Sequence, residues 1–367
     1  MKRVCIFNIG TWHNHHEKEN VLVKLMEACQ YTNLGVIENQ SGKTTGKEAL
    51  DRVKKGVTTN NGGYKWINDG ANSLGTGIIE QTNVNMEVLE LLSDQHHLSD
   101  VVIVGHSRGA ILSIRIAAKL LEALPDVRCH LFLYDPVKRM SGGTDKYNRE
   151  IHENVKSIRV IAMEDQTQLD FKLMTIKRRN GSSDRGDIKQ SDYTRLPGTH
   201  GTATQVTGHP IGQVGCILAL IWLNRCSVSL ASGVPIETND LLKAYCEIPR
   251  KNPVKRIGSI LKREVNDFEN GRGFTKMVTL GGGRTAKLDQ KAGENKFMGT
   301  QFFVNEQHYS LFVDRYPILG STIAGRQRPK FSKSKGWEHE LDKLKIADSP
   351  TYVYIDGLLR SASSVVA

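Results

Sequence analysis

The stretch "VVIVGHSRGAILSIRIAAKLL", residues 101–121, restricts the possible folds of this 367-residue chain more than any other segment. Its first four residues are β-branched without polar alternation, which predicts a strand buried on both faces, as in a parallel sheet. The amphipathic run over 109–124 predicts a helix. The pentapeptide "GHSRG" joins the two and has the G-x-S-x-G form of a nucleophile elbow, a sharp turn that lifts a serine hydroxyl clear of the sheet. Ser107 is therefore the candidate nucleophile.

Such a turn also supplies part of an oxyanion hole. The backbone N–H of Arg108 would point toward the same place, at the positive end of the helix. A second donor is expected from the loop after a neighbouring strand, and Gly10 and Thr11 follow an apolar strand at 3–9. Two simpler interpretations stay open: Ser107 could be an ordinary helix N-cap, and Gly10 an ordinary turn glycine.

Strands and helices alternate over the first 165 residues. Strands are expected at 3–9, 101–104, 130–135 and 157–163, and helices at 19–30, 82–94, 109–124 and 146–155. Thr82 or Asn83 is the expected cap of the second helix, and residues 36–80, rich in Gly, Asn, Lys and Thr, are expected to form loops with short elements. The pattern predicts an α/β fold, an α/β-hydrolase-like and mostly parallel sheet with helices on both faces. In such sheets functional groups gather at the carboxyl ends of the strands.

A serine nucleophile needs a base, and histidine accepts a proton near neutral pH. The order Ser, acid, His that is typical of this fold class favours histidines late in the chain. His200 and His209 lie in the loop "DYTRLPGTHGTATQVTGHPIG", before an apolar helix expected at 211–224. We favour His200 for its loop position, with His209 as the alternative.

Two aspartates are candidates for the acid that orients the imidazole. Asp135 ends the strand after the elbow helix, and Pro136 fixes the exit of the chain. Asp165 ends the following strand. Both placements suit a triad, and we favour Asp135, with Asp165 as the alternative. An ordinary Asp-Pro turn and a solvated acidic pair are the structural alternatives.

Several of these segments together resemble a known family. "GHSRGAILSIRIA" resembles the "GFSRGA…AR" elbow of a bacterial and fungal α/β-hydrolase family that includes phospholipase effectors delivered by type VI secretion. Weaker matches follow in the same order over roughly residues 3–225, in "CIFNIGTWHN…ENVLVKL", "FLYDPV", "IAMEDQTQLDFKL" and "LPGTHGTATQVTGH…ALIWL". The resemblance implies a Ser-Asp-His hydrolase of ester bonds, most often in phospholipid, with Ser107 as nucleophile and His200 as base.

The chain departs from this family in two places. Asn8 or Ile9 stands where the family has the Asp of "DGT", and Thr202 stands where it has the Asp of "HsDV". These departures bear on the substrate class more than on the nucleophile. They also motivate a second hypothesis, a catalytically retired hydrolase fold that binds a membrane or a protein partner.

The net charge of +11 is concentrated late in the chain. Residues 250–335 carry 18 lysines and arginines against 7 acidic residues. We therefore expect two parts, a catalytic domain over 1–245 and a basic segment over 246–367 that acts as a lid or docks on a membrane or partner. A basic surface favours anionic partners. An anionic membrane surface and a lipid ester substrate are expected, and no nucleic acid, since no binding motif accompanies the charge.

Metals, cofactors and disulfides are not expected. The six cysteines are scattered without a C-x-x-C pair, as in a protein folded in a reducing compartment. The loop "HNHHE" lacks metal-ligand spacing, and "GGGR" lacks the P-loop lysine. The apolar run in "MKRVCIFNIG" is too short for a signal peptide. We expect synthesis in the cytoplasm without a cleaved signal, so that export would need a specialised secretion system.

Overall fold

The computed structural model describes most of residues 2–246, with short gaps of which 138–149 and 164–172 are the longest. Beyond 246 it describes 274–280, 284–290, 310–316, 352 and 354–360. Within 250–335 the structure describes only a hairpin of β12 (Phe274–Leu280) and β13 (Arg284–Gln290) and residues 310–316. Residues 254–269, whose spacing predicts a basic helix, lie outside the described residues. The prediction that 246–367 docks on a membrane or partner stays a prediction.

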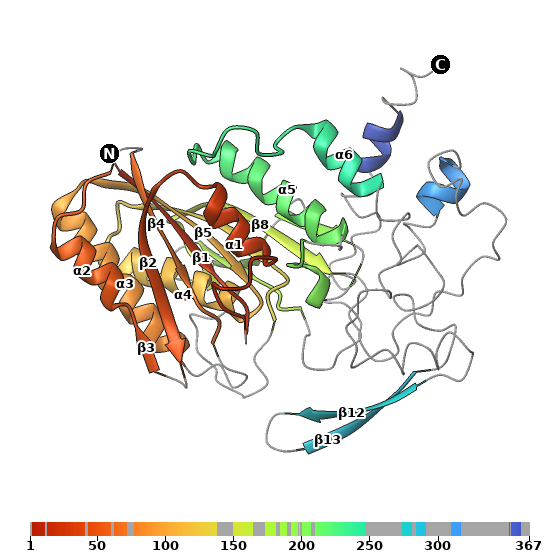
Figure 1. Ribbon diagram of the computed structural model, residues 1–367, viewed down its shortest axis with the longest axis horizontal. Helices are drawn as coiled ribbons and strands as arrows, with labels where there is room; N and C mark the ends of the chain where they lie inside the picture. The colour runs from red at the N-terminus through yellow and green to blue at the C-terminus, as the bar shows by residue number, and fades with distance from the viewer. Residues whose placement is uncertain are drawn as a thin grey trace. The chain divides into compact units, whose positions relative to one another are not determined.

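An eight-stranded sheet with the order β11-β8-β6-β5-β1-β4-β2-β3 is the centre of the fold (Figure 1). Its strands are β1 (Lys2–Asn8), β2 (Thr32–Gln40), β3 (Lys43–Thr45), β4 (Gly63–Asn68), β5 (Leu98–His106), β6 (Arg128–Tyr134), β8 (Val155–Met163) and β11 (Tyr193–Leu196). The pairs β2–β4, β4–β1, β1–β5, β5–β6 and β6–β8 are parallel, whereas β3 forms an antiparallel hairpin with β2. The predicted α/β class with a mostly parallel sheet is confirmed.

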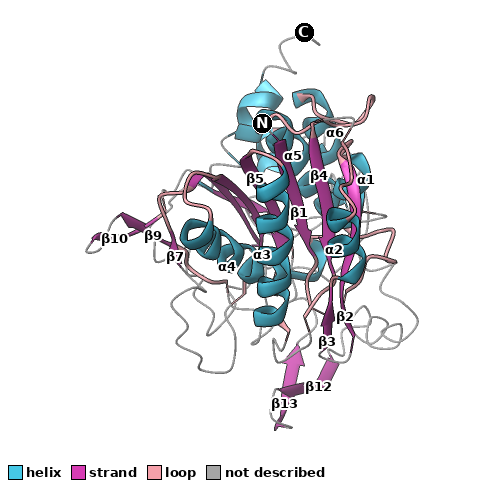
Figure 2. Ribbon diagram, turned by 90° about the vertical axis from the view of Figure 1, so that its left-hand side faces the viewer, coloured by secondary structure: helices cyan, strands magenta, loops and turns pink. Residues whose placement is uncertain are grey.

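Helices cover both faces of this sheet, as Figure 2 shows. The helices α2 (Lys47–Lys54), α3 (Ile78–Gln95) and α4 (Arg108–Ala123) pack side by side on one face. The helix α1 (Val21–Ala28) covers the other face, and the Asn20 side chain caps it by accepting the Leu22 N–H at 2.9 Å. The buried central strands are almost continuously apolar because both of their faces lie under helices.

The strand order places a topological switch point between β1 and β5. From β1 the chain crosses through α1 toward β2, on one side of the sheet, whereas from β5 it crosses through α4 toward β6, on the other side. The loops that leave β1 and β5 therefore diverge at the carboxyl ends of the strands. In open α/β sheets this is where ligands bind. The two loops carry Gly10 and Thr11, and Ser107 and Arg108.

One segment of the sequence prediction is wrong. Residues 36–80 contain the rest of β2, the hairpin strand β3, helix α2 and the central strand β4, and not mainly loops. Their signal is diluted by polar residues, of which Lys65 in β4 is the clearest case. The Lys65 ammonium donates to the backbone carbonyls of Met26, at 2.8 Å, and Cys29, so a strand position next to the core accepts a charged residue.

Three smaller predictions are also wrong. Helix α3 begins earlier than expected, after Gly77, and Thr82 lies inside it with its hydroxyl bonded to the Ile78 carbonyl at 2.7 Å. In the described part of the expected helix 146–155, Glu150–Ile151 form strand β7, which pairs with β9 (Lys177–Asn180). The aromatic and β-branched segment "TYVYIDG", 351–357, has the composition of a strand but is helical where it is described, at 352 and over 354–357. The residue pattern of a single sequence does not distinguish helix from strand reliably in segments this short.

The chain divides into two compact units. The first comprises residues 1–162, 173–193 and 216–236, and the second comprises 163–172, 194–215 and 237–367. The first unit contains Gly10, Thr11, Ser107, Arg108 and Asp135, and the second contains His200. The expected boundary near 245 stays a prediction.

Candidate active site at the strand β5 to helix α4 junction

Ser107 has the backbone of a nucleophile elbow. It lies between β5 and α4 with φ 57° and ψ −120°, a conformation that L-residues seldom adopt. Its N–H donates to the Tyr134 carbonyl at 2.9 Å, which fixes the turn against the neighbouring strand β6. The serine occupies the N-cap position of α4, but its side chain makes no capping hydrogen bond. Capping of helix α4 therefore does not explain the strained backbone of Ser107.

The two glycines of the pentapeptide are required by close contacts. A Cβ added to Gly105 would lie 2.3 Å from Ser113 Oγ and 2.6 Å from the Gly109 carbonyl oxygen. A Cβ added to Gly109 would lie 2.2 Å from the Asn8 carbonyl oxygen. Helix α4 thus starts in direct contact with the end of β1, and this contact brings the β1 loop beside Ser107.

Gly10 and Thr11 lie next to the nucleophile. A Cβ added to Gly10 would lie 2.4 Å from His106 Nδ1 and 3.2 Å from Ser107 Cβ, so only glycine fits at this approach. Thr11 Oγ1 accepts a hydrogen bond from Arg108 Nη1 at 2.9 Å. The structure therefore brings together Ser107, Arg108, Gly10 and Thr11, four residues that the sequence singled out from segments almost 100 positions apart.

A buried amide network supports this junction, and the sequence analysis did not anticipate it. Asn8 Nδ2 donates to Ser113 Oγ at 2.8 Å, and Ser113 Oγ donates to the Gly109 carbonyl at 2.8 Å. Asn8 Oδ1 accepts from Asn68 Nδ2 at 2.7 Å, and Asn68 Oδ1 accepts from Asn85 Nδ2 at 2.8 Å. Asn8, which with Ile9 is one of the two residues that stand near the aspartate of the family pattern, is therefore bonded inside the core beneath the elbow.

The network continues to helix α3 and to the end of β4. Asn85 Oδ1 accepts from Trp66 Nε1 at 2.7 Å, and Asn85 Nδ2 also donates to the Gln81 carbonyl at 2.6 Å. Gln81 Nε2 donates to the Asp69 carbonyl at 2.7 Å. Buried polar groups that are satisfied in this way give a site a single well-defined geometry.

Histidines of the loop after β1 pair with carboxylates. His15 Nδ1 lies 2.9 Å from Asp69 Oδ1, and the His15 N–H donates to the same oxygen at 2.9 Å. His13 Nδ1 lies 2.5 Å from Glu17 Oε2, and its ring centroid is 6.5 Å from that of His106. Two imidazole–carboxylate pairs thus lie at the same edge of the sheet as Ser107. The order of residues in the chain gave no reason to expect them.

Asp135 follows strand β6, directly next to the elbow. Its backbone has φ 40°, its side chain is buried, and its N–H donates to the Ile161 carbonyl of β8 at 2.7 Å. The register pairs His106 of β5 with Tyr134 of β6, so Asp135 leaves the sheet at the same level as Ser107. A positive φ at a residue followed by proline is not typical of an ordinary turn.

The remaining candidates lie elsewhere. His200 begins a short 3₁₀ helix, His200–Thr202, in the second unit, and is buried. Thr202 is buried in the same turn. Asp165 and His209, the alternative acid and base, lie outside the described residues.

Within the described part of the chain, no group of three or more His, Cys, Asp or Glu side chains could hold a metal ion. The same residues contain no helix that is long and apolar enough to cross a membrane.

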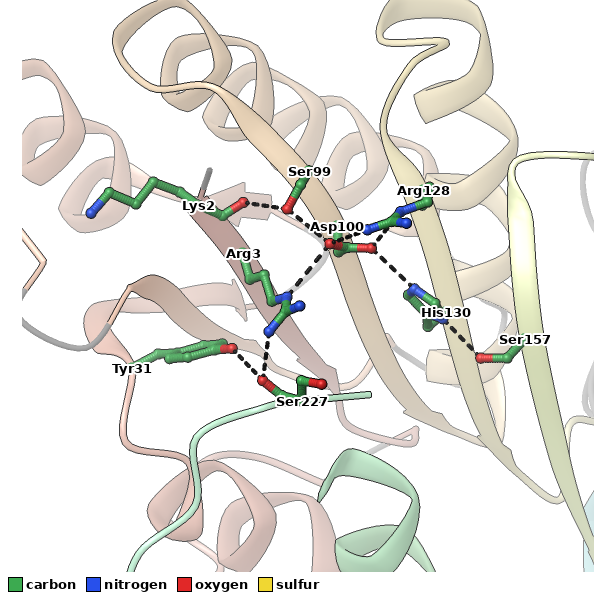
Figure 3. A network of polar contacts seen from close by, with 9 residues as sticks. All are labelled: Lys2, Arg3, Tyr31, Ser99, Asp100, Arg128, His130, Ser157 and Ser227. Atoms are coloured by element: carbon green, nitrogen blue, oxygen red, sulfur yellow. Dashed lines mark hydrogen bonds and ion pairs between the residues drawn. The ribbon is translucent and has the colours of Figure 1, made fainter. Parts of the chain in front are cut away.

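A second polar cluster lies at the opposite, amino ends of the strands (Figure 3). At its centre the buried Asp100 carboxylate accepts from Arg128 Nη2 at 3.0 Å, from Ser99 Oγ at 2.8 Å and from Arg3 Nε at 3.5 Å, and lies 3.3 Å from His130 Nε2. Burial alone would raise the pKa of Asp100, but the bonds from Arg128, Ser99 and His130 outweigh it and lower the pKa to about 2. Burial lowers the pKa of His130.

Comparison with known proteins gives little beyond the fold. No family model matches the sequence. No curated protein matches it either. A solved structure of an uncharacterized protein from Pseudomonas aeruginosa is similar with 11% identity and a TM-score of 0.43 over 96% of this chain, which spans 63% of that protein's length. A "putative cell surface hydrolase" from Lactobacillus plantarum WCFS1 is similar with 13% identity and a TM-score of 0.36, over 61% of this chain and 92% of the other. Likenesses this distant carry no argument about function.

Proposed function

We propose that the protein is a serine hydrolase that cleaves carboxylic esters, with Ser107 as its nucleophile. One observation carries the proposal: Ser107 adopts a strained backbone conformation at a strand–helix junction without capping the helix. Such strain costs on the order of 1–3 kcal/mol and persists where it serves a function. Its place beside the topological switch point of the sheet supports the same conclusion.

In this proposal His200 is the general base, and Asp135 orients it. Asp135 is supported by its position beside the elbow and by its unusual backbone. His200 is supported by the order of residues in the chain and by the family resemblance. Asp165 and His209 remain the alternative acid and base.

The reaction then proceeds in two steps, acylation of Ser107 and hydrolysis of the acyl-enzyme, which use the same imidazole and the same oxyanion donors. The imidazole takes the Ser107 proton as Oγ bonds to the ester carbonyl carbon, and the imidazolium gives that proton to the leaving alcohol as the C–O bond breaks. Water, deprotonated by the same imidazole, releases the acyl group and regenerates Ser107. The N–H of Arg108, at the start of α4, and an N–H of the Gly10–Thr11 loop hold the oxyanion in both steps.

The charge of the chain and the family resemblance both bear on the class of substrate. The basic segment at 250–335 favours anionic surfaces, and the resemblance implies a lipid ester, so we propose a phospholipid or another lipid ester as substrate. Action on the membranes of another cell, after export by a specialised secretion system, is part of the same proposal.

The first test is labelling by a fluorophosphonate, read by intact mass. Wild type should gain one adduct, and Ser107→Ala should gain none. Ser93→Ala, at a half-buried position of helix α3, is the matched control and should label like wild type. Circular dichroism should show that all three proteins are folded. Labelling of folded Ser107→Ala at the wild-type rate would overturn the assignment of the nucleophile.

A binding protein with a retired hydrolase fold is the second candidate function. The observation that favours it is that both Asn8, which is bonded inside the core, and Ile9 are uncharged, whereas the family pattern has an aspartate at one of these two positions. Folded wild type that gains no adduct, but binds vesicles containing anionic lipid, would support this candidate against the enzyme.

A further inference from the structure

The peptide between Gly10 and Thr11 is held in one orientation beside the proposed nucleophile. The Gly10 carbonyl accepts the His13 N–H at 3.2 Å. A Cβ added to Gly70 would lie 1.8 Å from the Gly10 carbonyl oxygen and 2.7 Å from the carbonyl carbon. The Gly10 carbonyl is therefore directed toward Gly70, just beyond the end of β4, and cannot rotate without displacing that backbone.

The strand order indicates the side on which the Thr11 N–H lies. A trans peptide directs its carbonyl and its N–H to opposite sides, and none of the described peptide bonds is cis. Strand β1 lies between β4 and β5 in the sheet. With the Gly10 carbonyl directed toward β4, the Thr11 N–H is on the side of β5, which leads directly into Ser107. Within the described residues, this N–H donates to no protein acceptor.

Asp69, the first residue after β4, fixes the far end of the same loop. Its buried carboxylate accepts the His15 N–H at 2.9 Å through Oδ1, and the same oxygen lies 2.9 Å from His15 Nδ1. The next residue, Gly70, donates its N–H to the His13 carbonyl at 3.0 Å. The Asp69 carbonyl accepts from Gln81 Nε2 of helix α3 at 2.7 Å. The loop after β1 is thus tied to a fixed point at the end of β4.

We infer that Asp69 is a positioning residue of the proposed active site, which holds the loop after β1 so that the Thr11 N–H donates to the oxyanion formed at Ser107. This inference rests on the proposed function, because the oxyanion forms only if Ser107 is the nucleophile. A donor of this kind has to be in place before the charge develops. Hydrogen bonds from behind the loop, such as those of Asp69 to His15, supply that rigidity.

The test measures how fast the fluorophosphonate reacts, because this needs no knowledge of the natural substrate. Ser107 Oγ bonds to phosphorus, fluoride leaves, the base accepts the serine proton, and the phosphoryl oxygen carries the developing negative charge in the oxyanion hole. The rate constant at saturating probe, kinact, therefore reports on the Thr11 N–H. The fraction of protein that is finally labelled reports on folding instead, and KI reports on binding of the probe.

Asp69→Ala should lower kinact by roughly 10- to 100-fold, since misplacement by about 1 Å can cost about 100-fold. Asp69→Asn keeps an oxygen acceptor for the His15 N–H at the same place and should keep kinact near the wild-type value. In both variants KI and the final labelled fraction should equal those of wild type. Asp126→Ala, at an exposed position in the turn after α4, is the control and should react like wild type.

Two results would overturn the inference. One is a wild-type kinact in Asp69→Ala, which would mean that the loop is held without this carboxylate. The other is an equal loss in Asp69→Asn and Asp69→Ala, which would mean that the charge of Asp69 takes part in the chemistry.

A second variant covers the case in which Asp69→Ala does not fold. His15→Ala removes the imidazole contact and keeps the carboxylate, so it should also lower kinact, and a wild-type kinact in this variant would overturn the inference. Failure of the proposed function is distinguishable, because wild type would then not be labelled at Ser107.

Discussion

At the scale of single residues, glycines decide whether the elbow can form. Gly109 lies in the first turn of α4, where alanine would ordinarily stabilise a helix by about 0.5–1 kcal/mol. Its added Cβ, however, would lie 2.2 Å and 2.6 Å from the carbonyl oxygens of Asn8 and Ile9. Backbone atoms on a buried strand cannot move aside cheaply, so the steric cost outweighs the helix propensity.

We therefore expect Gly109→Ala to destabilise the protein by about 1–3 kcal/mol, the usual cost of overpacking a core. The fluorophosphonate should also label Ser107 more slowly, since the elbow has to shift. Thermal unfolding and the labelling rate check this. Gly357→Ala is the control, because an added Cβ there meets nothing within 4 Å. Equal melting temperatures for Gly109→Ala and wild type would contradict the expectation.

At the scale of elements, the amide network connects helices α3 and α4 with strands β1 and β4. Asn85 is its branch point on α3, with hydrogen bonds to Asn68, Trp66 and the Gln81 carbonyl. Without this side chain, the Trp66 N–H would be left in the core without its acceptor. A buried group without a partner costs more than an average hydrogen bond contributes.

Asn85→Ala should lower the free energy of unfolding by about 1–3 kcal/mol, measured by urea denaturation. Asn83→Ala is the matched control, since Asn83 is exposed on the same helix, and its effect should stay within about 0.5 kcal/mol. If the two variants were equally stable, the network would not hold α3 against the sheet.

At the scale of the whole molecule, the carboxyl ends and the amino ends of the sheet strands carry different groups of polar residues. The carboxyl ends carry the candidate site, while the amino ends are tied together by the Asp100 cluster of Figure 3. His130 Nδ1 lies 2.8 Å from Ser157 Oγ of β8, and Arg3 Nη1 donates to the Ser227 carbonyl at 2.8 Å. The cluster thus joins β1, β5, β6, β8 and the segment after helix α5 (Pro210–Arg225).

This cluster predicts how stability depends on pH. The pKa of His130 is lower in the folded than in the unfolded chain, so protonation favours unfolding, and stability falls as the pH drops below about 6.5. The pKa of Asp100 is also lowered by folding, so its contribution is complete above about pH 4 and is lost as the pH falls toward 2.

Urea denaturation between pH 8 and pH 5 separates the effect of His130 from that of Asp100, because Asp100 stays ionised over this range. Wild type should lose stability over this range, and His130→Gln should lose less, because glutamine can bond to Asp100 and Ser157 without titrating. The same loss in both proteins would assign the pH dependence to other groups.

The sequence by itself determined the central strand β5, the turn at Ser107, helix α4 and the parallel class of the sheet. A β-branched run, two glycines around one serine and an amphipathic run are local signals, so strand β5, the elbow at Ser107 and helix α4 were predictable from neighbouring residues. The alternation of strands and helices likewise predicted the parallel sheet, because the covering of both faces follows from the order of elements.

Tertiary structure alone decided how the polar side chains around the serine are bonded. Strand β4 was missed, because Lys65 is accepted in it only through the carbonyls of α1. The hydrogen bonds from Asn8 to Ser113 and from Arg108 to Thr11 join residues about 100 positions apart. No local pattern signals such contacts, since amide and guanidinium groups find their partners only after the sheet has brought the ends of β1 and β5 together.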